Sequence, residues 1–93
     1  IGVLELITVY NLQEQFYLSK ILINPAHISI VKDCDQYNTL LREGKMDIDF
    51  DQGVRFSEIT MSGHGGFQNY VVVGSATQIQ EKLKRNNIQL PRD

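Results

Sequence analysis

Four acidic residues in the middle of the chain have a spacing that could bind a metal ion. Asp47, Asp49 and Asp51 alternate, and Glu58 lies eleven positions after Asp47. In the calcium-binding loop of an EF-hand, oxygen ligands occupy the first, third, fifth and twelfth positions. The four carboxylates match those positions. The stretch KMDIDFDQGVRFSE therefore has to be interpreted either as a calcium site or as a strand with an acidic, solvated face.

The residues between the acids favour the strand. An EF-hand loop needs glycine at its sixth position, but Gln52 occupies it here and Gly53 comes one place late. Apolar residues alternate with the aspartates, which is typical of a strand with one buried and one wet face. We therefore predict a strand over residues 46–51 and no metal ligand set. A weak cation site of another kind at the aspartates is the alternative.

Two further stretches contain residue types found in catalytic or binding sites. Glycines flank His64 in SGHGGF, but the stretch lacks the lysine and the following helix of a phosphate-binding loop. Residues 63–66 are therefore predicted to form a hairpin turn. His27 and Cys34 have the residue types of a nucleophile and its base, but no third group is evident, so we predict no catalytic pair.

The composition fits a small globular protein. The chain has 93 residues, of which 42% are hydrophobic and 22% charged, consistent with a single domain over residues 1–93. The formal net charge of −2 gives no general attraction to nucleic acid or anionic lipid. Cys34 is the one cysteine in the sequence, which favours a reducing, cytoplasmic location. No apolar run approaches the roughly 18 residues of a membrane span, and the start lacks a signal peptide's basic segment.

Alternating hydrophobicity predicts a chain made mostly of strands. For residues 15–23 a short helix capped by Asn11 is the alternative, but the abrupt stop at Asn24-Pro25 favours a strand. The apolar phase changes between Phe56 and Ile59, which predicts a β-bulge near Ser57–Glu58. In addition to 46–51, the predicted strands cover residues 3–10, 15–23, 27–32, 54–62 and 67–73.

One helix is predicted at the C-terminal end, over residues 75–86. Ser75 and Gln78 have the spacing of a capping box, in which each side chain bonds the backbone of the other residue. Residues 33–45 differ in composition and are predicted to be an exposed insertion or loop. They could hold one helical turn over 37–43, ended by Gly44.

The order of these segments resembles the small flagellar FlbD-like proteins and related short bacterial and phage proteins of unknown function. The similar stretches are LELITVYN, FYLSKILINPAHISIV and FSEITMSGHGGFQNYVVVGSATQIQEKL, whereas residues 33–56 depart from the pattern. The resemblance implies a small, partly open SH3-like barrel with a terminal helix, and it implies no catalytic residues. The matching positions are Asn11, Asn24, Pro25, Ile28, Gly66, Tyr70, Val71 and Ser75.

The expected fold is mainly β (α+β): a small SH3-like, partly open antiparallel barrel of five or six strands with one C-terminal helix. Apolar residues on both faces of 3–10 indicate a central strand. The expected core residues are Leu4, Leu6, Phe16, Leu18, Ile28, Ile30, Ile48, Phe50, Phe56, Ile59, Val71, Val73, Ile79 and Leu83.

The expected function is that of a non-enzymatic interaction module without a cofactor, such as a phage or bacterial accessory protein. We expect a homo-oligomer formed by strand edges or an apolar face. A single-stranded nucleic-acid binder is the second hypothesis, since surface aromatics stack on bases, although the net charge opposes it. A calcium-binding protein using the four acids above is the third. The residues available for nucleic acid are Tyr10, Tyr17, Tyr37, Tyr70 and the basic cluster Lys82, Lys84 and Arg85.

Overall fold

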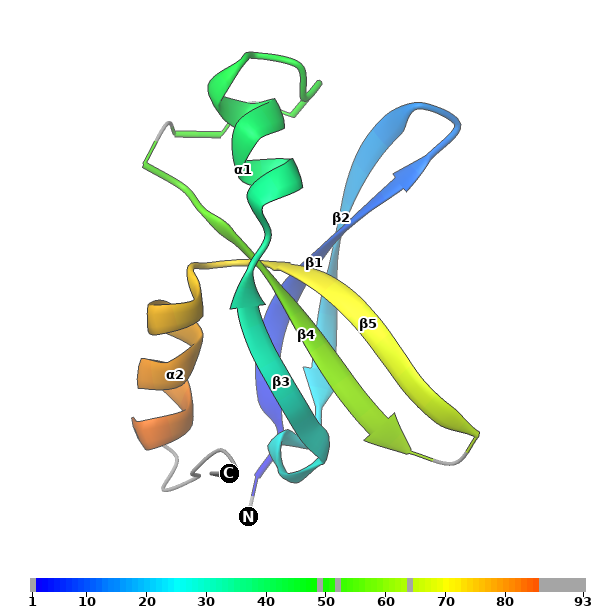
Figure 1. Ribbon diagram of the computed structural model, residues 1–93, viewed down its shortest axis with the longest axis vertical. Helices are drawn as coiled ribbons and strands as arrows, with labels where there is room; N and C mark the ends of the chain where they lie inside the picture. The colour runs from blue at the N-terminus through cyan, green and yellow to red at the C-terminus, as the bar shows by residue number, and fades with distance from the viewer. Residues whose placement is uncertain (1, 49, 52, 64, 86–93) are drawn as a thin grey trace.

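The computed structural model describes residues 2–48, 50–51, 53–63 and 65–85, which form one antiparallel sheet and two α-helices (Figure 1). The elements in chain order are β1 (Leu4–Leu12), β2 (Gln15–Ile23), the 3-10 turn η1 (Pro25–His27), β3 (Ile28–Asp33), α1 (Asp35–Arg42), β4 (Phe56–Gly63), β5 (Gly66–Val73) and α2 (Ala76–Arg85). The strands pair in the order β2-β1-β5-β4-β3. The mainly β class is confirmed. The sheet does not close on itself, because β2 and β3 remain its outer strands.

The first hairpin settles the open choice for residues 15–23 in favour of a strand. β1 and β2 pair over nine positions, from Leu4 with Ile23 to Leu12 with Gln15. Gln13 and Glu14 form the connecting turn, and both have positive φ angles, of 53° and 65°. Such a turn normally contains glycine or asparagine. The long ladder of paired residues offsets the cost of the left-handed backbone.

The sheet curls around an inner core. Leu4 and Leu6 of β1 lie in the same buried cluster as Ile28 of β3, although β5 and β4 stand between those strands. At about 4.8 Å per strand, a flat sheet would separate β1 from β3 by about 14 Å. Curling brings them together, and α2 packs against them. The inner core consists of Leu4, Leu6, Ile23, Ile28, Ile59, Val72, Ile79 and Leu83.

An outer core lies on the opposite face of the sheet, next to α1. Phe56 and Ile59 are both fully buried, but Phe56 belongs to the outer core and Ile59 to the inner one. Residues three apart on a strand face opposite sides. The predicted bulge near Ser57–Glu58 is therefore wrong: β4 pairs without interruption there, and the phase change reflects burial on both faces. The outer core consists of Val9, Cys34, Met46 and Phe56, surrounded by Phe16, Tyr37, Leu40, Leu41, Phe50, Val54, Val71 and Val73.

The predicted strand over 46–51 is also wrong. The described residues of this range form an irregular connection between α1 and β4. Met46 is buried in the outer core, and the Phe50 ring meets Phe56 edge-on with centroids 5.4 Å apart. The apolar residues of this stretch therefore follow the outer core, and the period-2 pattern does not come from a pleated strand.

Two residues expected in the core are exposed, Ile30 by 53% and Leu18 by 44%. The register between β3 and β4 shifts between Ile28 and Ile30, so that these two side chains lie on opposite faces. Leu18 lies on the outer strand β2. The expected core residues that are buried are Leu4, Leu6, Ile28, Phe56, Ile59, Ile79 and Leu83; Phe16, Ile48, Phe50, Val71 and Val73 are half-buried. The sequence did not lead us to expect burial of Val9, Ile23, Cys34, Met46 and Val72.

The capping box predicted for the C-terminal helix is confirmed. The Gln78 N–H donates to Ser75 Oγ at 3.1 Å, and the Ser75 N–H donates to Gln78 Oε1 at 2.8 Å. Asp33, at the end of β3, adds a third contact by accepting the Ala76 N–H at 2.9 Å. This carboxylate satisfies another terminal donor of α2 and joins the helix to the sheet.

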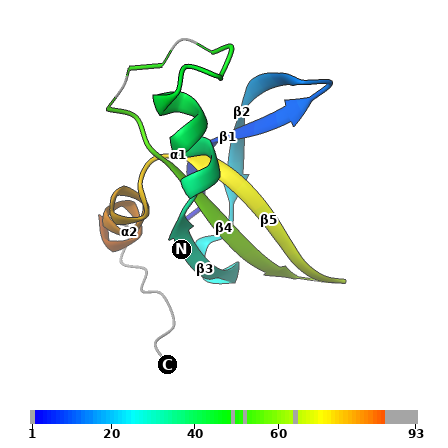
Figure 2. The ribbon, with the colours of Figure 1, turned by 45° about the horizontal axis from the view of Figure 1, so that its top comes forward.

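A second α-helix, α1, occupies most of residues 33–45, where the sequence indicated at most a helical turn. Gly44 ends it as expected: with φ of 70° its N–H donates to the Leu41 carbonyl, and the Lys45 N–H donates to the Leu40 carbonyl. The apolar side of α1 packs on the outer core. Figures 1 and 2 both show the closed end of the β1–β2 hairpin pointing away from α2.

Candidate interaction surfaces

The acidic residues proposed as calcium ligands have separate partners. Asp47 Oδ1 accepts the Phe16 N–H at 3.1 Å, and Asp51 Oδ1 accepts the N–H of Gly53 at 3.0 Å. Asp49 lies outside the described residues. Within the described part of the chain, no group of three or more His, Cys, Asp or Glu is arranged to hold a metal ion. The fourth acid, Glu58, forms an ion pair on β4 with Lys32 of β3, at 3.6 Å.

The histidine and cysteine considered as a catalytic pair are far apart. His27 precedes β3 and Cys34 follows it, so the strand holds their backbones about 20 Å apart at the usual rise of a β-strand. Cys34 is buried in the outer core. This separation is too large for the imidazole of His27 and the thiol of Cys34 to share a hydrogen bond. The predicted hairpin turn is confirmed, since Gly63 pairs with Gly66 across it.

The residues considered for nucleic-acid binding do not form one surface. The rings of Tyr10 and Tyr17 stack on the β1–β2 hairpin, with centroids 5.5 Å apart. The basic cluster Lys82, Lys84 and Arg85 lies on the last turn of α2, at the other side of the molecule (Figures 1 and 2). The two other tyrosines are half-buried against the cores: Tyr37 in the outer one and Tyr70 in the inner one.

Of the two edge strands in the described part of the chain, β2 exposes more large apolar side chains than β3. We call residues Gln15–Ile23 the β2 edge. β2 is an outer strand of the sheet. Leu22 is 61% exposed, Leu18 is exposed on the same face of the strand, and Tyr17 is exposed on the other face. The one charged side chain of this strand, Lys20, lies 3.8 Å from Glu5 of the neighbouring strand. A long strand edge of this kind can pair with another strand.

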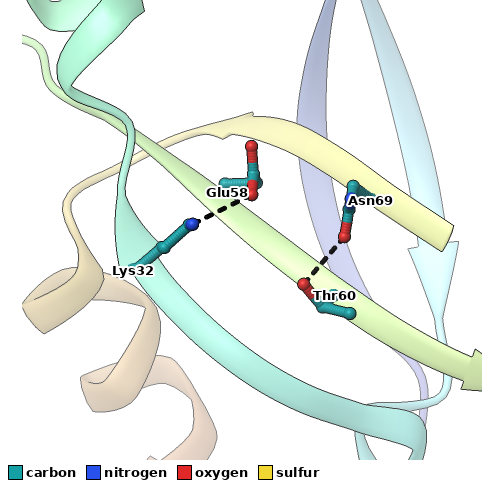
Figure 3. A network of polar contacts seen from close by, with 4 residues as sticks. All are labelled: Lys32, Glu58, Thr60 and Asn69. Atoms are coloured by element: carbon teal, nitrogen blue, oxygen red, sulfur yellow. Dashed lines mark hydrogen bonds and ion pairs between the residues drawn. The ribbon is translucent and has the colours of Figure 1, made fainter. Parts of the chain in front are cut away.

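The outer face of β3, β4 and β5 carries a row of polar contacts beyond the outer core (Figure 3). Lys32 pairs with Glu58, and the Thr60 hydroxyl donates to Asn69 Oδ1 at 2.8 Å. The residue pairs lie side by side across the strands. Because the charges balance and the polar groups are partnered with each other, this face offers little electrostatic attraction to a charged ligand.

Comparison with protein-family models, with curated proteins and with solved structures found no match. The likeness to FlbD-like proteins therefore rests on the sequence pattern. Among the residues described, no helix is long and apolar enough to cross a membrane.

Tyr37 gives the outer core a predicted pH dependence. Burial raises the pKa of its hydroxyl above the ordinary value of 10.0, and the nearby Cys34 adds to the effect. Above about pH 10 the unfolded chain loses a proton that the folded chain keeps, so this contribution to stability falls as pH rises. Urea unfolding between about pH 8 and pH 11 should show a steeper loss in the unsubstituted protein than in Tyr37→Phe. Equal slopes would contradict this, and the exposed Tyr17→Phe serves as the control.

Proposed function

We propose that this chain is a non-enzymatic protein-interaction module that self-associates through the β2 edge. The supporting observation is the combination of an outer strand, nine residues long, with exposed large apolar side chains and a single charge. Proteins usually protect such edges by charge, proline, bulges or a covering element. Here Lys20 is the one charged residue of the strand, and its pairing with Glu5 reduces its repulsive effect.

A two-fold axis perpendicular to the sheet would pair two β2 strands antiparallel and continue the sheet across both copies. Centring this pairing on Lys20 would set two ammonium groups opposite each other, which is unfavourable. Centring it on Ser19 places each Lys20 beside Leu18 of the partner subunit, so that its aliphatic stem packs on an apolar side chain. We propose the Ser19-centred register for the dimer.

The proposal also takes the curled five-stranded sheet as a partly open SH3-like barrel. The inner core, to which all five strands and α2 contribute side chains, supports that description. We further propose a cytoplasmic location, since the lone Cys34 thiol suits a reducing compartment.

Light scattering on a size-exclusion column tests self-association directly. We expect the mass of two chains for the unsubstituted protein, unchanged by millimolar calcium, and the mass of one chain for the double variant Leu18→Lys and Leu22→Lys. In the Ser19-centred register the new ammonium at position 18 would lie opposite Lys20 of the partner subunit, which is unfavourable, and both residues are exposed, so the monomer should still fold.

The matched control is Phe67→Lys, which introduces the same charge at a residue 72% exposed on β5, a strand that is not at the edge of the sheet. It should keep the mass of two chains. A monomeric unsubstituted protein, or a dimer that persists in the double variant, would reject the β2 edge as the contact. Circular dichroism of each variant separates loss of association from loss of folding.

A further inference from the structure

The β2 edge has a contact from a distant part of the chain at one of its ends. The N–H of Phe16, the second residue of β2, donates to the Asp47 carboxylate at 3.1 Å. Asp47 lies in the connection between α1 and β4. Its neighbour Met46 is buried in the outer core, and the Phe16 ring meets Tyr37 edge-on in the same core. Packing beside both partners therefore holds this hydrogen bond in place.

The same contact shows which backbone groups of β2 face the edge. In an antiparallel sheet, every second residue of a strand directs its N–H and C=O groups to the same neighbour. Because Phe16 directs its N–H to Asp47 and not to β1, Leu18, Lys20 and Leu22 direct their backbone groups to the same free edge. These even-numbered residues thus carry the donors and acceptors that a second β2 strand would use.

The Asp47 carboxylate and a second β2 strand compete for the Phe16 N–H. In the Ser19-centred register, Leu18 would pair with Lys20 of the partner subunit, and Phe16 would pair with Leu22 of the partner subunit. The Leu22 carbonyl would then have to lie about 3 Å from the Phe16 nitrogen, which is the position that Asp47 Oδ1 occupies. The two acceptors exclude each other.

We propose that Asp47 regulates self-association by covering the Phe16 end of the β2 edge in the single chain. The inference rests on the proposed dimer and on its Ser19-centred register. Because the dimer is symmetric, the two Asp47 carboxylates cover both ends of the contact, and while they stay bound only Leu18 and Lys20 can pair. Pairing over the whole length from Phe16 to Leu22 requires each Asp47 to release its N–H. Covering an edge in this way is one means by which proteins limit strand pairing.

Sedimentation equilibrium over a range of protein concentrations tests this proposal by measuring the dissociation constant of the dimer. Asp47→Ala should lower that constant about tenfold or more, because the separate chains no longer have a charge-assisted hydrogen bond to break. Asp47→Asn keeps an acceptor oxygen without the charge and should give an intermediate value. The matched control is Asp51→Ala, which removes the same charge from the same connection. Asp51 accepts the N–H of Gly53, so its loss should leave the constant unchanged.

Nuclear magnetic resonance detects the release of Asp47 directly. Its carboxyl carbon signal should shift as rising protein concentration converts single chains to dimers, whereas the corresponding signal of Asp51 should stay in place. An Asp47 signal that does not move would overturn the inference. Adding Asp47→Ala to the double variant Leu18→Lys and Leu22→Lys should still give the mass of one chain, and a dimer there would show that Asp47 controls a different surface.

The dissociation constants also separate this inference from the proposed function. If Asp47→Ala dissociates as readily as the unsubstituted protein, or more readily, while both form dimers, Asp47 does not compete with the partner strand and the dimer alone stands. If the unsubstituted protein and the Asp47 variants all have the mass of one chain, the proposed self-association is rejected and the role of Asp47 is rejected with it.

Discussion

Replacing Phe56 by alanine is expected to destabilise the protein by about 3–5 kcal/mol, the usual cost of deleting a buried aromatic ring. Phe56 is fully buried and is the largest side chain at the centre of the outer core. Its ring has edge-to-face contacts with Phe50 and Tyr37, at centroid distances of 5.4 and 6.0 Å. Such pairs add to the energy of simple burial.

The loss should be cooperative, because Phe56 joins elements that are distant in sequence. α1 contacts the sheet through the outer core, as do Met46, Phe50 and Val54 from the segment that follows it, so a cavity there weakens both attachments. Urea unfolding at neutral pH measures the change in free energy. Phe67→Ala, at the exposed end of β5, is the aromatic control and should cost less than about 1 kcal/mol.

If Phe56→Ala also lowered the free energy of unfolding by less than about 1 kcal/mol, the outer core would not support the fold. An intermediate result can be resolved by hydrogen exchange. If α1 alone opens, its amides should lose protection while β1 and β5 keep theirs. The expected result is a loss throughout, since Phe56 is also the first residue of β4, which is a central strand of the curled sheet.

The parts of the fold that follow from local patterns were predictable. Alternation of apolar residues gives the strands, the glycines at 63–66 give the second hairpin, and Ser75 with Gln78 gives the start of α2. In each case the residues that determine the structure lie within a few positions of one another, so the sequence alone contains the physical cause.

The errors arise where distant contacts override a local pattern. Residues 46–51 alternate like a strand, but Met46 and Phe50 pack over the outer core without forming a strand, because Phe56 and α1 provide the apolar surface. Ile30 lies two positions after the buried Ile28 and would face the core in a regular strand, yet the register shift after Ile28 turns its side chain outward. Two cores on opposite faces of one sheet also produced the change of phase that suggested a bulge.

The candidate surfaces also depend on contacts between distant parts of the chain. The apolar residues of β2 are visible in the sequence, but only the structure shows that Leu18 and Leu22 are exposed and that β2 is an edge strand. By contrast, the acidic residues that do match a linear motif have unrelated partners in the structure.

Asn38→Leu is expected to cost about 1–3 kcal/mol, because it leaves a buried backbone donor without its acceptor. The Phe56 N–H donates to Asn38 Oδ1 at 2.7 Å, and this side chain takes the place of a neighbouring strand at the start of β4. The Phe56 carbonyl loses one donor but keeps the Cys34 N–H, at 2.9 Å. The unsatisfied N–H should therefore account for most of the loss.

Hydrogen exchange at the Phe56 amide distinguishes this specific effect from general destabilisation. In Asn38→Leu that amide should exchange faster than its neighbours in β4, whereas a general loss would affect the whole strand alike. Asn38→Asp keeps an acceptor oxygen and should retain more of the protection than leucine does. Asn69→Leu removes an amide of the same kind from the exposed Thr60 contact and should cost no more than about 0.5 kcal/mol. If both leucine variants lost equal stability, the Asn38 side chain would not be holding α1 to β4.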